Sequence, residues 1–316
     1  MGRTFHFLSH QNREKIAETA FQLLEQVGVT LTHLKARGLL QKAGASLEGD
    51  RARIPAKLVE QALSSAPAQI DIYTRNGEQT MRLGGGSAHF GAHTDAPDVL
   101  DPFSGERRPC TQADVTRNVV LIDALDQIDY TTASGMVADC PAEIADRVSL
   151  GECLINSPKP VLVMPVTPES LVDCHHMAIL AADGEENLRQ RPLMIVYSEP
   201  VSPLIHPDGS IQRLLYCADH EIPLVYTPYA AMGGTAPLSP AAITAQLCAE
   251  SLSGLVIHQL QQPGAPYIFG GMASVMDMRT TIFSYGAPEF QRGNTLMAEM
   301  AHHFELPNFG TAGTSD

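Results

Sequence analysis

The sequence predicts an α/β protein, a TIM (β/α)8 barrel that is incomplete at its C-terminal end and follows a mixed N-terminal extension. From residue 130 onward, short apolar runs typical of buried strands alternate with helical patterns. The strand starts are spaced by roughly 30 to 45 residues, the length of one βα unit. Six such units in one direction favour a barrel or a doubly wound sheet. No G-x-G-x-x-G pattern follows the first strand, which weakens the doubly wound alternative.

Residues 1–110 are expected to form the extension, which would pack on the barrel. Ser9 can cap a first helix that Gly28 ends, because glycine readily adopts the left-handed conformation of a helix terminus. The run of glycines at 84–86 opens an irregular stretch that reaches Arg108. The other expected elements are helices at 33–43 and 55–64, and strands at 70–73 and 79–83.

Residues 111–316 are expected to form the first six βα units of the barrel. Thr111 and Asp114 have the spacing of a capping box and predict a helix that runs to Leu125. The expected strands lie at 130–137, 161–166, 193–198, 223–229, 267–273 and 308–312. A closed barrel has eight strands, so we expect about two further βα units to be missing after residue 316.

Composition narrows the class of protein. Hydrophobic residues make up 44% and charged residues 18% of the chain, as in a folded protein with a substantial core. The net charge of −14 and the absence of a Lys/Arg run argue against nucleic acid as a partner. We also expect no membrane association and a cytoplasmic protein, since the N-terminus lacks a signal-peptide core and no apolar stretch approaches the roughly 20 residues that cross a bilayer. The six cysteines form no C-x-x-C pair and predict free thiols.

In a barrel, the active site lies at the C-terminal ends of the strands. Glu199 directly follows an apolar run and is therefore a candidate general base, or a counter-charge for a cationic substrate. Equally, it can cap a loop or pair with an arginine. Both interpretations remain open on the sequence alone.

The segment from Tyr226 to Pro240 is the most distinctive part of the chain. Tyr226, Tyr229 and Met232 precede a Gly-Gly loop, and aromatic faces bind methylated ammonium groups by cation–π attraction. Tyr229 and Met232 lie further into the loop and are the better candidates, while Tyr226 can instead point into the core. Phe269 and Gly271, at the end of the next strand, are further candidates.

Metal ligands are only weakly indicated, and we expect no metal bound directly. The pairs His175-His176 and His302-His303 are adjacent on helices, where neighbouring side chains diverge. A looser cluster of His89, His93, Asp95 and Asp98 does not lie on a predicted helix.

Five segments resemble the trimethylamine methyltransferase-like family and keep its order along nearly the whole chain. They are D-V-L-D-P-F-S-G-E-R-R-P followed by T-Q-A-D (98–114), Y-A-A-M-G-G-T-A-P (229–237), M-D-M-R-T (276–280), G-A-P-E (286–289) and G-T-A-G-T-S-D (310–316).

The resemblance implies a TIM-barrel enzyme of methylamine metabolism or methanogenesis. Such an enzyme moves a methyl group from a tertiary or quaternary methylamine, of the trimethylamine or glycine betaine type, to the Co(I) of a corrinoid on a separate protein. Glu199, Asp95 and Asp316 are the implied catalytic residues. The implied substrate-binding residues are Tyr226, Tyr229, Met232, Phe269, Gly271, Thr311, Thr314 and Ser315. A homo-oligomer is also compatible.

Family members that act on trimethylamine carry pyrrolysine near the end of the present sequence, and this chain contains none. An amber codon after residue 316 would indicate the trimethylamine branch, whereas continuation without pyrrolysine would indicate the quaternary-amine branch. A gene fragment is equally compatible. The competing hypotheses are a metal-dependent lyase or aldolase on a similar barrel, and a truncated remnant without activity.

Overall fold

The computed structural model describes residues 6–92 and 96–311. The chain forms two compact units, and each is described by itself. Unit 1 comprises Met1–Gln69, Gly84–Gly86 and Ser198–Asp316, and unit 2 comprises Ile70–Leu83 and Ser87–Tyr197. Both units combine parallel strands with helices, which confirms the predicted α/β class. The boundary expected at residue 110 stays a prediction, as does closure of a barrel.

Parallel strands form the centre of unit 1. Strands β12 (Leu224–Tyr226), β14 (Tyr267–Gly270) and β16 (Asn308–Phe309) pair side by side in that order. After short breaks, β12 and β14 continue as β13 (Tyr229–Met232) and β15 (Met272–Val275), which pair in parallel as well. The predicted strands at 223–229 and 267–273 are therefore each divided in two. The helices that follow are α9 (Pro240–Gln261) and α10 (Pro288–His303), both opened by proline at a first-turn position.

Helices α9 and α10 cover one face of these strands, and aromatic side chains fill the contact. A Cβ atom on Gly254 of α9 would lie 2.4 Å from Cδ1 of Tyr226, so this glycine is what lets the helix approach the Tyr226 ring. The Phe269 ring packs against Phe304, with 5.7 Å between ring centroids. Side chains alternate along a strand. The residues that directly follow Tyr226 on β12 and Phe269 on β14 therefore point to the opposite face of the strands, away from the helices.

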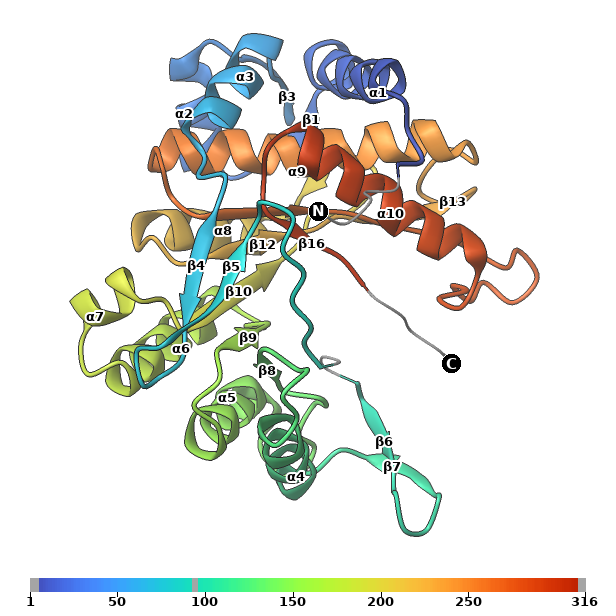
Figure 1. Cartoon of the computed structure of the whole chain (residues 1–316). Coiled ribbons are helices and arrows are strands. Elements are labelled where there is room, and N and C mark those ends of the chain that lie inside the picture. Colours follow the sequence, from blue (N-terminus) through green and yellow to red (C-terminus); the bar gives the residue numbers. More distant parts are fainter. Residues whose placement is uncertain (1–5, 93–95, 312–316) are drawn as a thin grey trace. The chain divides into compact units, whose positions relative to one another are not determined.

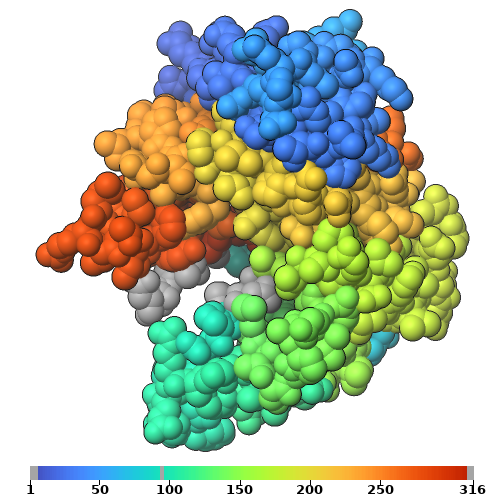
Figure 2. Space-filling model, turned by 180° about the vertical axis from the view of Figure 1, so that it is seen from behind, coloured from blue at the N-terminus to red at the C-terminus, as the bar shows by residue number. Residues whose placement is uncertain are grey.

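Helix α9 is the central helix of unit 1. Three N-terminal helices, α1 (His10–Gln22), α2 (Leu34–Ala43) and α3 (Ala56–Ser65), pack against it, as the blue and orange segments in Figures 1 and 2 show. Within the described residues, α9 is the one helix long and apolar enough to cross a membrane, which corrects the expectation that no such stretch exists. Its apolar surface is instead covered by protein, since 83% of its most apolar window is buried.

The predicted ends of the first helices are confirmed. The Ser9 side chain accepts a hydrogen bond from the backbone N–H of Asn12, and α1 continues into a π-helical turn, η1 (Leu23–Val27), that ends at Gly28 with φ = 75°. A small sheet that the sequence did not predict joins this region to a distant loop. Its strands are β11 (Ile205–His206), β1 (Val29–Leu31), β3 (Arg51–Arg53) and β2 (Ser46–Glu48), in that order.

Unit 2 has its own parallel strands and helices. Strands β8 (Thr131–Thr132), β9 (Val161–Val163) and β10 (Met194–Ser198) pair in that order, with Ser198 at the boundary to unit 1. The helices are α4 (Gln112–Asp123), η2 (Ala142–Ile144), α5 (Ala145–Asn156), α6 (Pro168–Ala181) and α7 (Glu185–Gln190), while α8 (Asp208–Asp219) belongs to unit 1. Thr111 and Asp114 form the predicted capping box at α4.

Strand β8 is much shorter than the predicted strand at 130–137. The chain leaves the sheet because the backbone N–H of Met136 donates to the carbonyl of Ala96, at 2.9 Å. The close packing of Gly135 on Cys110 fixes this departure, since a Cβ at Gly135 would lie 2.5 Å from the Cys110 sulfur.

Two hairpins complete unit 2. The first, β4 (Ile70–Tyr73) with β5 (Gln79–Leu83), confirms the prediction. The second, β6 (Asp98–Leu100) with β7 (Arg107–Pro109), lies where an irregular stretch was expected. Its turn is stabilised by Asp101, whose Oδ1 accepts from the backbone N–H groups of Phe103 and Ser104, both at 3.0 Å. These bonds and the Arg108 guanidinium lower the pKa of Asp101 to about 2. The six cysteines are free, as predicted.

The approach of α9 to Tyr226 gives a test of the core. Replacing Gly254 with alanine should lower the free energy of unfolding by about 1–3 kcal/mol, because the added methyl group overlaps the Tyr226 ring. Gly38 in α2 is the matched control, since no atom lies within 4 Å of its Cβ position. Gly38→Ala should raise the free energy of unfolding by about 0.5–1 kcal/mol. Urea denaturation of both variants measures the difference, and equal effects would contradict this packing.

Candidate functional site

The face of the unit 1 strands that α9 and α10 leave uncovered carries a row of small, hydroxyl and aromatic side chains. We call this set the inner row: Thr227, Gly270, Phe309, Tyr229, Met272 and Thr311. Register places Gly270 beside Phe309 and Tyr229 beside Met272. A Cβ atom on Gly270 would lie 2.5 Å from the Thr227 hydroxyl, and the Thr311 hydroxyl donates to the Met272 sulfur at 3.3 Å. Residues from three parallel strands and their C-terminal extensions therefore meet here.

Tyr229 is the centre of an aromatic cluster, defined here as Tyr229, Phe283 and Tyr285. The Phe283 ring lies 5.1 Å from the Tyr229 ring at 73°, and the Tyr285 ring lies 6.0 Å away at 26°, measured between centroids. Burial is the main cause that raises the pKa of Tyr229, so its phenol stays neutral at physiological pH. The cluster thus presents several aromatic faces and edges without a formal charge.

The loop after β15 brings Phe283 and Tyr285 back to Tyr229. The backbone N–H of Asp277 donates to the carbonyl of Ile282 at 2.9 Å, and that of Ser284 donates to the carbonyl of Val275 at 3.1 Å. Sequence analysis missed both aromatics, although F-S-Y directly follows the M-D-M-R-T segment that carries the family resemblance. The turn at 277–282 brings both aromatic residues back to Tyr229, and this turn is seen in the structure but was not predicted from the sequence.

Two of the predicted substrate-binding residues, Tyr229 and Thr311, belong to the inner row. Four others lie on the helix-covered face of the strands. Tyr226 and Phe269 pack under the helices as described above, Met232 is 5% exposed, and a Cβ on Gly271 would lie 2.6 Å from the Met297 side chain of α10. The alternation of side chains along the strands causes this division. These four residues therefore point away from the inner row.

Glu199 directly follows β10 and is exposed. Its charge acts to raise the pKa of Arg213 in α8, although burial has the larger effect and lowers that pKa overall. Arg213 also donates from Nε to the Ser198 hydroxyl at 3.3 Å. Glu199 therefore lies near an arginine. A catalytic role for Glu199 stays a prediction.

Asp95, Asp316, Thr314 and Ser315 lie outside the described residues, so their predicted roles are not tested. Asp98 forms an ion pair with Arg107, at 2.9 Å. Among residues 6–92 and 96–311, no three His, Cys, Asp or Glu side chains are grouped so that they could hold a metal ion.

A buried polar network on α9 holds the loop that follows Glu199. The Glu250 carboxylate accepts from the Ser202 hydroxyl at 2.6 Å, from the Leu204 backbone N–H at 2.9 Å and from the Gln246 amide at 2.9 Å. Burial nevertheless raises the pKa of Glu250. Sequence analysis missed this network because its polar groups lie inside an otherwise apolar helix.

His206 fixes the end of the same loop. One ring nitrogen lies 2.7 Å from the Tyr226 hydroxyl and the other lies 2.8 Å from the Ser253 hydroxyl. Complete burial lowers the pKa of His206 to about 4, so the ring is neutral at physiological pH. The hydroxyl of Tyr226 thus serves this structural contact.

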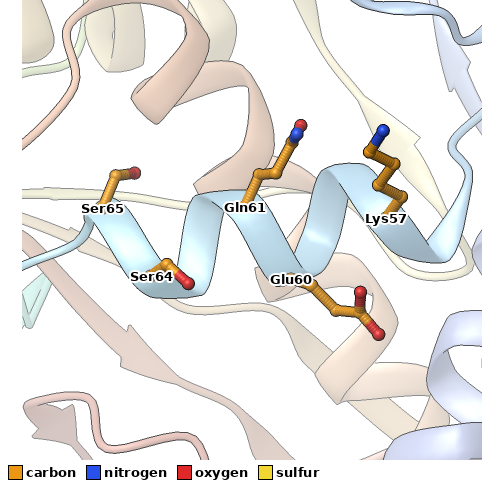
Figure 3. Close-up of a pocket in the computed structure, with 5 residues that line it drawn as sticks. All are labelled: Lys57, Glu60, Gln61, Ser64 and Ser65. Atoms are coloured by element: carbon orange, nitrogen blue, oxygen red, sulfur yellow. The ribbon is translucent and has the colours of Figure 1, made fainter.

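A surface hollow on α3 is a poor alternative site. Its lining residues are Lys57, Glu60, Gln61, Ser64 and Ser65, all from one helix. Figure 3 shows Lys57 and Gln61 extending to one side of the helix and Glu60 to the other, so these groups do not converge on one point. Ser65 also donates its hydroxyl to Gln259 at 3.0 Å.

Comparison with known proteins identifies the family. The family model described as trimethylamine methyltransferase matches residues 2–316 of the chain. The chain belongs to the trimethylamine methyltransferase family. The resemblance inferred from the sequence is thereby confirmed.

Several characterised members of the trimethylamine methyltransferase family are similar to the chain. The trimethylamine methyltransferase of Desulfitobacterium hafniense is 27% identical over 303 residues, which cover 95% of this chain and 61% of that protein. The glycine betaine methyltransferase of Desulfitobacterium hafniense is 25% identical, covering 99% and 65% respectively. The proline betaine:corrinoid methyltransferase of Eubacterium limosum is 26% identical, covering 98% and 65%. The chain thus spans less than two thirds of the length of these relatives.

A solved structure supports the fold. The monomethylamine methyltransferase of Methanosarcina barkeri superposes with a TM-score of 0.54 at 12% sequence identity, covering 94% of this chain and 66% of that one. At this identity the similarity concerns the fold alone.

Burial of His206 predicts a pH-dependent stability. The unfolded ring has a pKa of about 6.5 and the folded ring one of about 4, so the unfolded chain binds more protons between these values. The free energy of unfolding should therefore fall as the pH drops through this range, by up to about 3 kcal/mol. Urea denaturation at several pH values measures the slope. His206→Gln should make the slope less steep without removing it, because burial also lowers the pKa of His258, to about 3. His302→Gln, an exposed control, should leave the slope unchanged. An unchanged slope in His206→Gln would contradict the assignment.

Proposed function

We propose that this chain binds a tertiary or quaternary methylamine on the inner row and presents one methyl group to the Co(I) of a corrinoid held by a separate protein. Family membership supports methyl transfer as the reaction class. The aromatic cluster of Tyr229, Phe283 and Tyr285 is the main support for this site. It lies at the C-terminal ends of the unit 1 strands.

Aromatic rings suit this substrate because the positive charge of a methylated ammonium is spread over its methyl groups. Such a cation cannot donate strong hydrogen bonds when it is quaternary, but its methyl groups can lie against π faces. Each contact with a ring contributes about 0.5–2 kcal/mol. The half-buried Tyr229 and Met272 would exclude water from one side of the cation while leaving another side open.

In the reaction, the carbon–nitrogen bond breaks with its electron pair remaining on nitrogen, and the amine leaves neutral. The corrinoid supplies a Co(I) nucleophile that accepts the methyl group. This chain's residues therefore need to hold the amine in one orientation, because correct positioning of two reactants contributes much of the rate of a bimolecular step. The corrinoid belongs to the partner protein, and no described residue is assigned to it.

The remaining residues inferred from the resemblance stay proposals for the same reaction. Glu199, Asp95 and Asp316 are the proposed catalytic group, and Thr311, Thr314 and Ser315 the proposed lining that follows β16. The amine itself, the partner's identity and the oligomeric state are left to experiment. Metal analysis of the purified protein distinguishes the lyase alternative, which would retain a stoichiometric divalent ion.

Removing the central ring tests the proposed site. Tyr229→Leu should weaken binding of glycine betaine by roughly 2- to 30-fold, because leucine preserves bulk but lacks a π face. Isothermal titration measures the dissociation constant. Tyr216→Leu in α8 is the matched control and should leave it unchanged.

The full reaction is tested by mixing the protein, a methylated amine and a corrinoid protein reduced to Co(I). Methylation of the cobalt, followed by absorbance, should depend on all three components. Binding of the amine without transfer would leave the recognition proposal intact and reject catalysis by the chain. Absence of binding to both glycine betaine and trimethylamine would reject the proposed function altogether.

A further inference from the structure

A buried polar pair on α9 holds two loops of unit 1. Glu250 is 0% exposed and Gln246 is 7% exposed, and they lie four residues apart on one side of the helix. The Glu250 carboxylate accepts from the Ser202 hydroxyl and the Leu204 backbone N–H, both in the loop that follows β10. The Gln246 amide donates to Glu250 and to the carbonyl of Thr235, in the loop that follows β13. The pair therefore ties both loops to one helix.

Glu250 is a costly residue for the interior of a helix layer. Its three donors are a hydroxyl, a backbone N–H and a side-chain amide, and none of these groups carries a positive charge. Burying a carboxylate is expensive unless a cation offsets the lost hydration, whereas an apolar side chain would fill the same position without that cost. The buried residues of α9 are mostly apolar. The loops that Glu250 holds therefore offer an explanation that packing alone does not.

The loop held by Glu250 pairs directly with Tyr229. Val201 and Ile205 exchange two backbone hydrogen bonds, at 2.8 and 2.9 Å, and thereby close a turn. We call residues 201–205 the anchored turn, since both of the loop groups that donate to Glu250 lie within it. Val201 also pairs in parallel with Tyr229, on the edge of β13 that faces away from β15. The backbone of Tyr229 is therefore held from one side by β15 and from the other by the anchored turn.

The second loop holds the other part of the same strand. The backbone N–H of Ala231 donates to the Thr235 hydroxyl at 2.9 Å, and the Thr235 carbonyl accepts from Gln246 at 3.0 Å. Strand β13 is thus connected to the polar pair twice, at Tyr229 through the anchored turn and at Ala231 through Thr235. Since the aromatic cluster has its centre on β13, the position of the Tyr229 ring depends on how this strand is held.

We infer that Glu250 is a positioning residue, which holds Tyr229 through the anchored turn in the orientation that receives the methylated ammonium. This inference rests on the proposed function. Glu250 does not touch the amine, because its carboxylate is enclosed by the protein groups that donate to it. It acts instead on the placement of the Tyr229 ring, on which cation–π attraction depends. Positioning is also what a methyl transfer between two separately held reactants requires of this chain.

The orientation of Tyr229 can be measured without any ligand. In protein labelled with fluorotyrosine, the fluorine NMR signal that disappears in Tyr229→Phe belongs to this residue. Glu250→Met, which removes all three hydrogen bonds, should shift or broaden that signal. Glu250→Gln should leave it in place, because an amide can accept and donate at the same positions.

Two further variants separate positioning from general damage to the fold. Thr244→Val, the matched control on α9, should not move the Tyr229 signal, since the Thr244 hydroxyl donates within the helix to the carbonyl of Pro240. Ser202→Ala removes one of the three bonds from the loop side and should shift the signal even if Glu250→Met does not fold. An unmoved Tyr229 signal in Ser202→Ala and in folded Glu250→Met would overturn the inference.

Binding measurements show whether Glu250 acts through Tyr229. By isothermal titration of the folded chain, Glu250→Met should weaken glycine betaine binding by roughly 2- to 30-fold, as expected for a displaced ring. Adding Glu250→Met to Tyr229→Leu should weaken binding by less than about 2-fold beyond Tyr229→Leu alone, because two residues that act through one contact are not additive. Glu250→Gln should bind within about 2-fold of the unaltered protein.

The remaining outcomes distinguish this inference from the proposed function. Additive losses in the double variant would mean that Glu250 affects binding without Tyr229, and the inference would be wrong. If the unaltered protein binds neither glycine betaine nor trimethylamine while the Tyr229 signal shifts as expected, Glu250 does position Tyr229 and the proposed function alone fails.

Discussion

The alternation of side chains along the parallel strands of unit 1, together with the close approach of α9, sets the positions of the inner-row residues. Gly254 lets α9 approach Tyr226, and this contact assigns one face of β12 and β14 to the core. The neighbouring residues then face the other side, where Thr227, Gly270 and Tyr229 lie. A side chain of any size at position 254 would force the helix away from the strand. The inner row thus depends on a contact made on the opposite face.

Local signals in the sequence were sufficient for much of the fold. Ser9, Gly28 and the pair Thr111–Asp114 define helix ends through contacts within a few residues, and the structure has those ends. The strand cores were found because buried parallel strands are continuous apolar runs. By contrast, β13 and β15 were not separated from β12 and β14, since their breaks depend on pairing between strands rather than on local pattern.

The site was only partly predictable for a related reason. The two-residue period of a strand divides its side chains into two sets but does not say which set the helices cover. The sequence therefore provided the same reason for choosing Tyr229 as for choosing Tyr226, Met232, Phe269 and Gly271. In the structure, the last four pack toward α9 and α10, whereas Tyr229 lies on the opposite face. Phe283 and Tyr285 reach the site through a turn that pairs with β15, and no local signal encodes that contact. The arginine near Glu199 was likewise a question of tertiary structure, since Arg213 lies far along the chain in α8.

A methylated ammonium is proposed to bind on the inner row, against the aromatic cluster. A crystal structure of this protein with glycine betaine would test it most directly. Density for the ammonium is expected within about 6 Å of the Tyr229, Phe283 or Tyr285 ring centroids. Density for the ligand at another place, such as the hollow on α3, with the aromatic cluster empty, would contradict it.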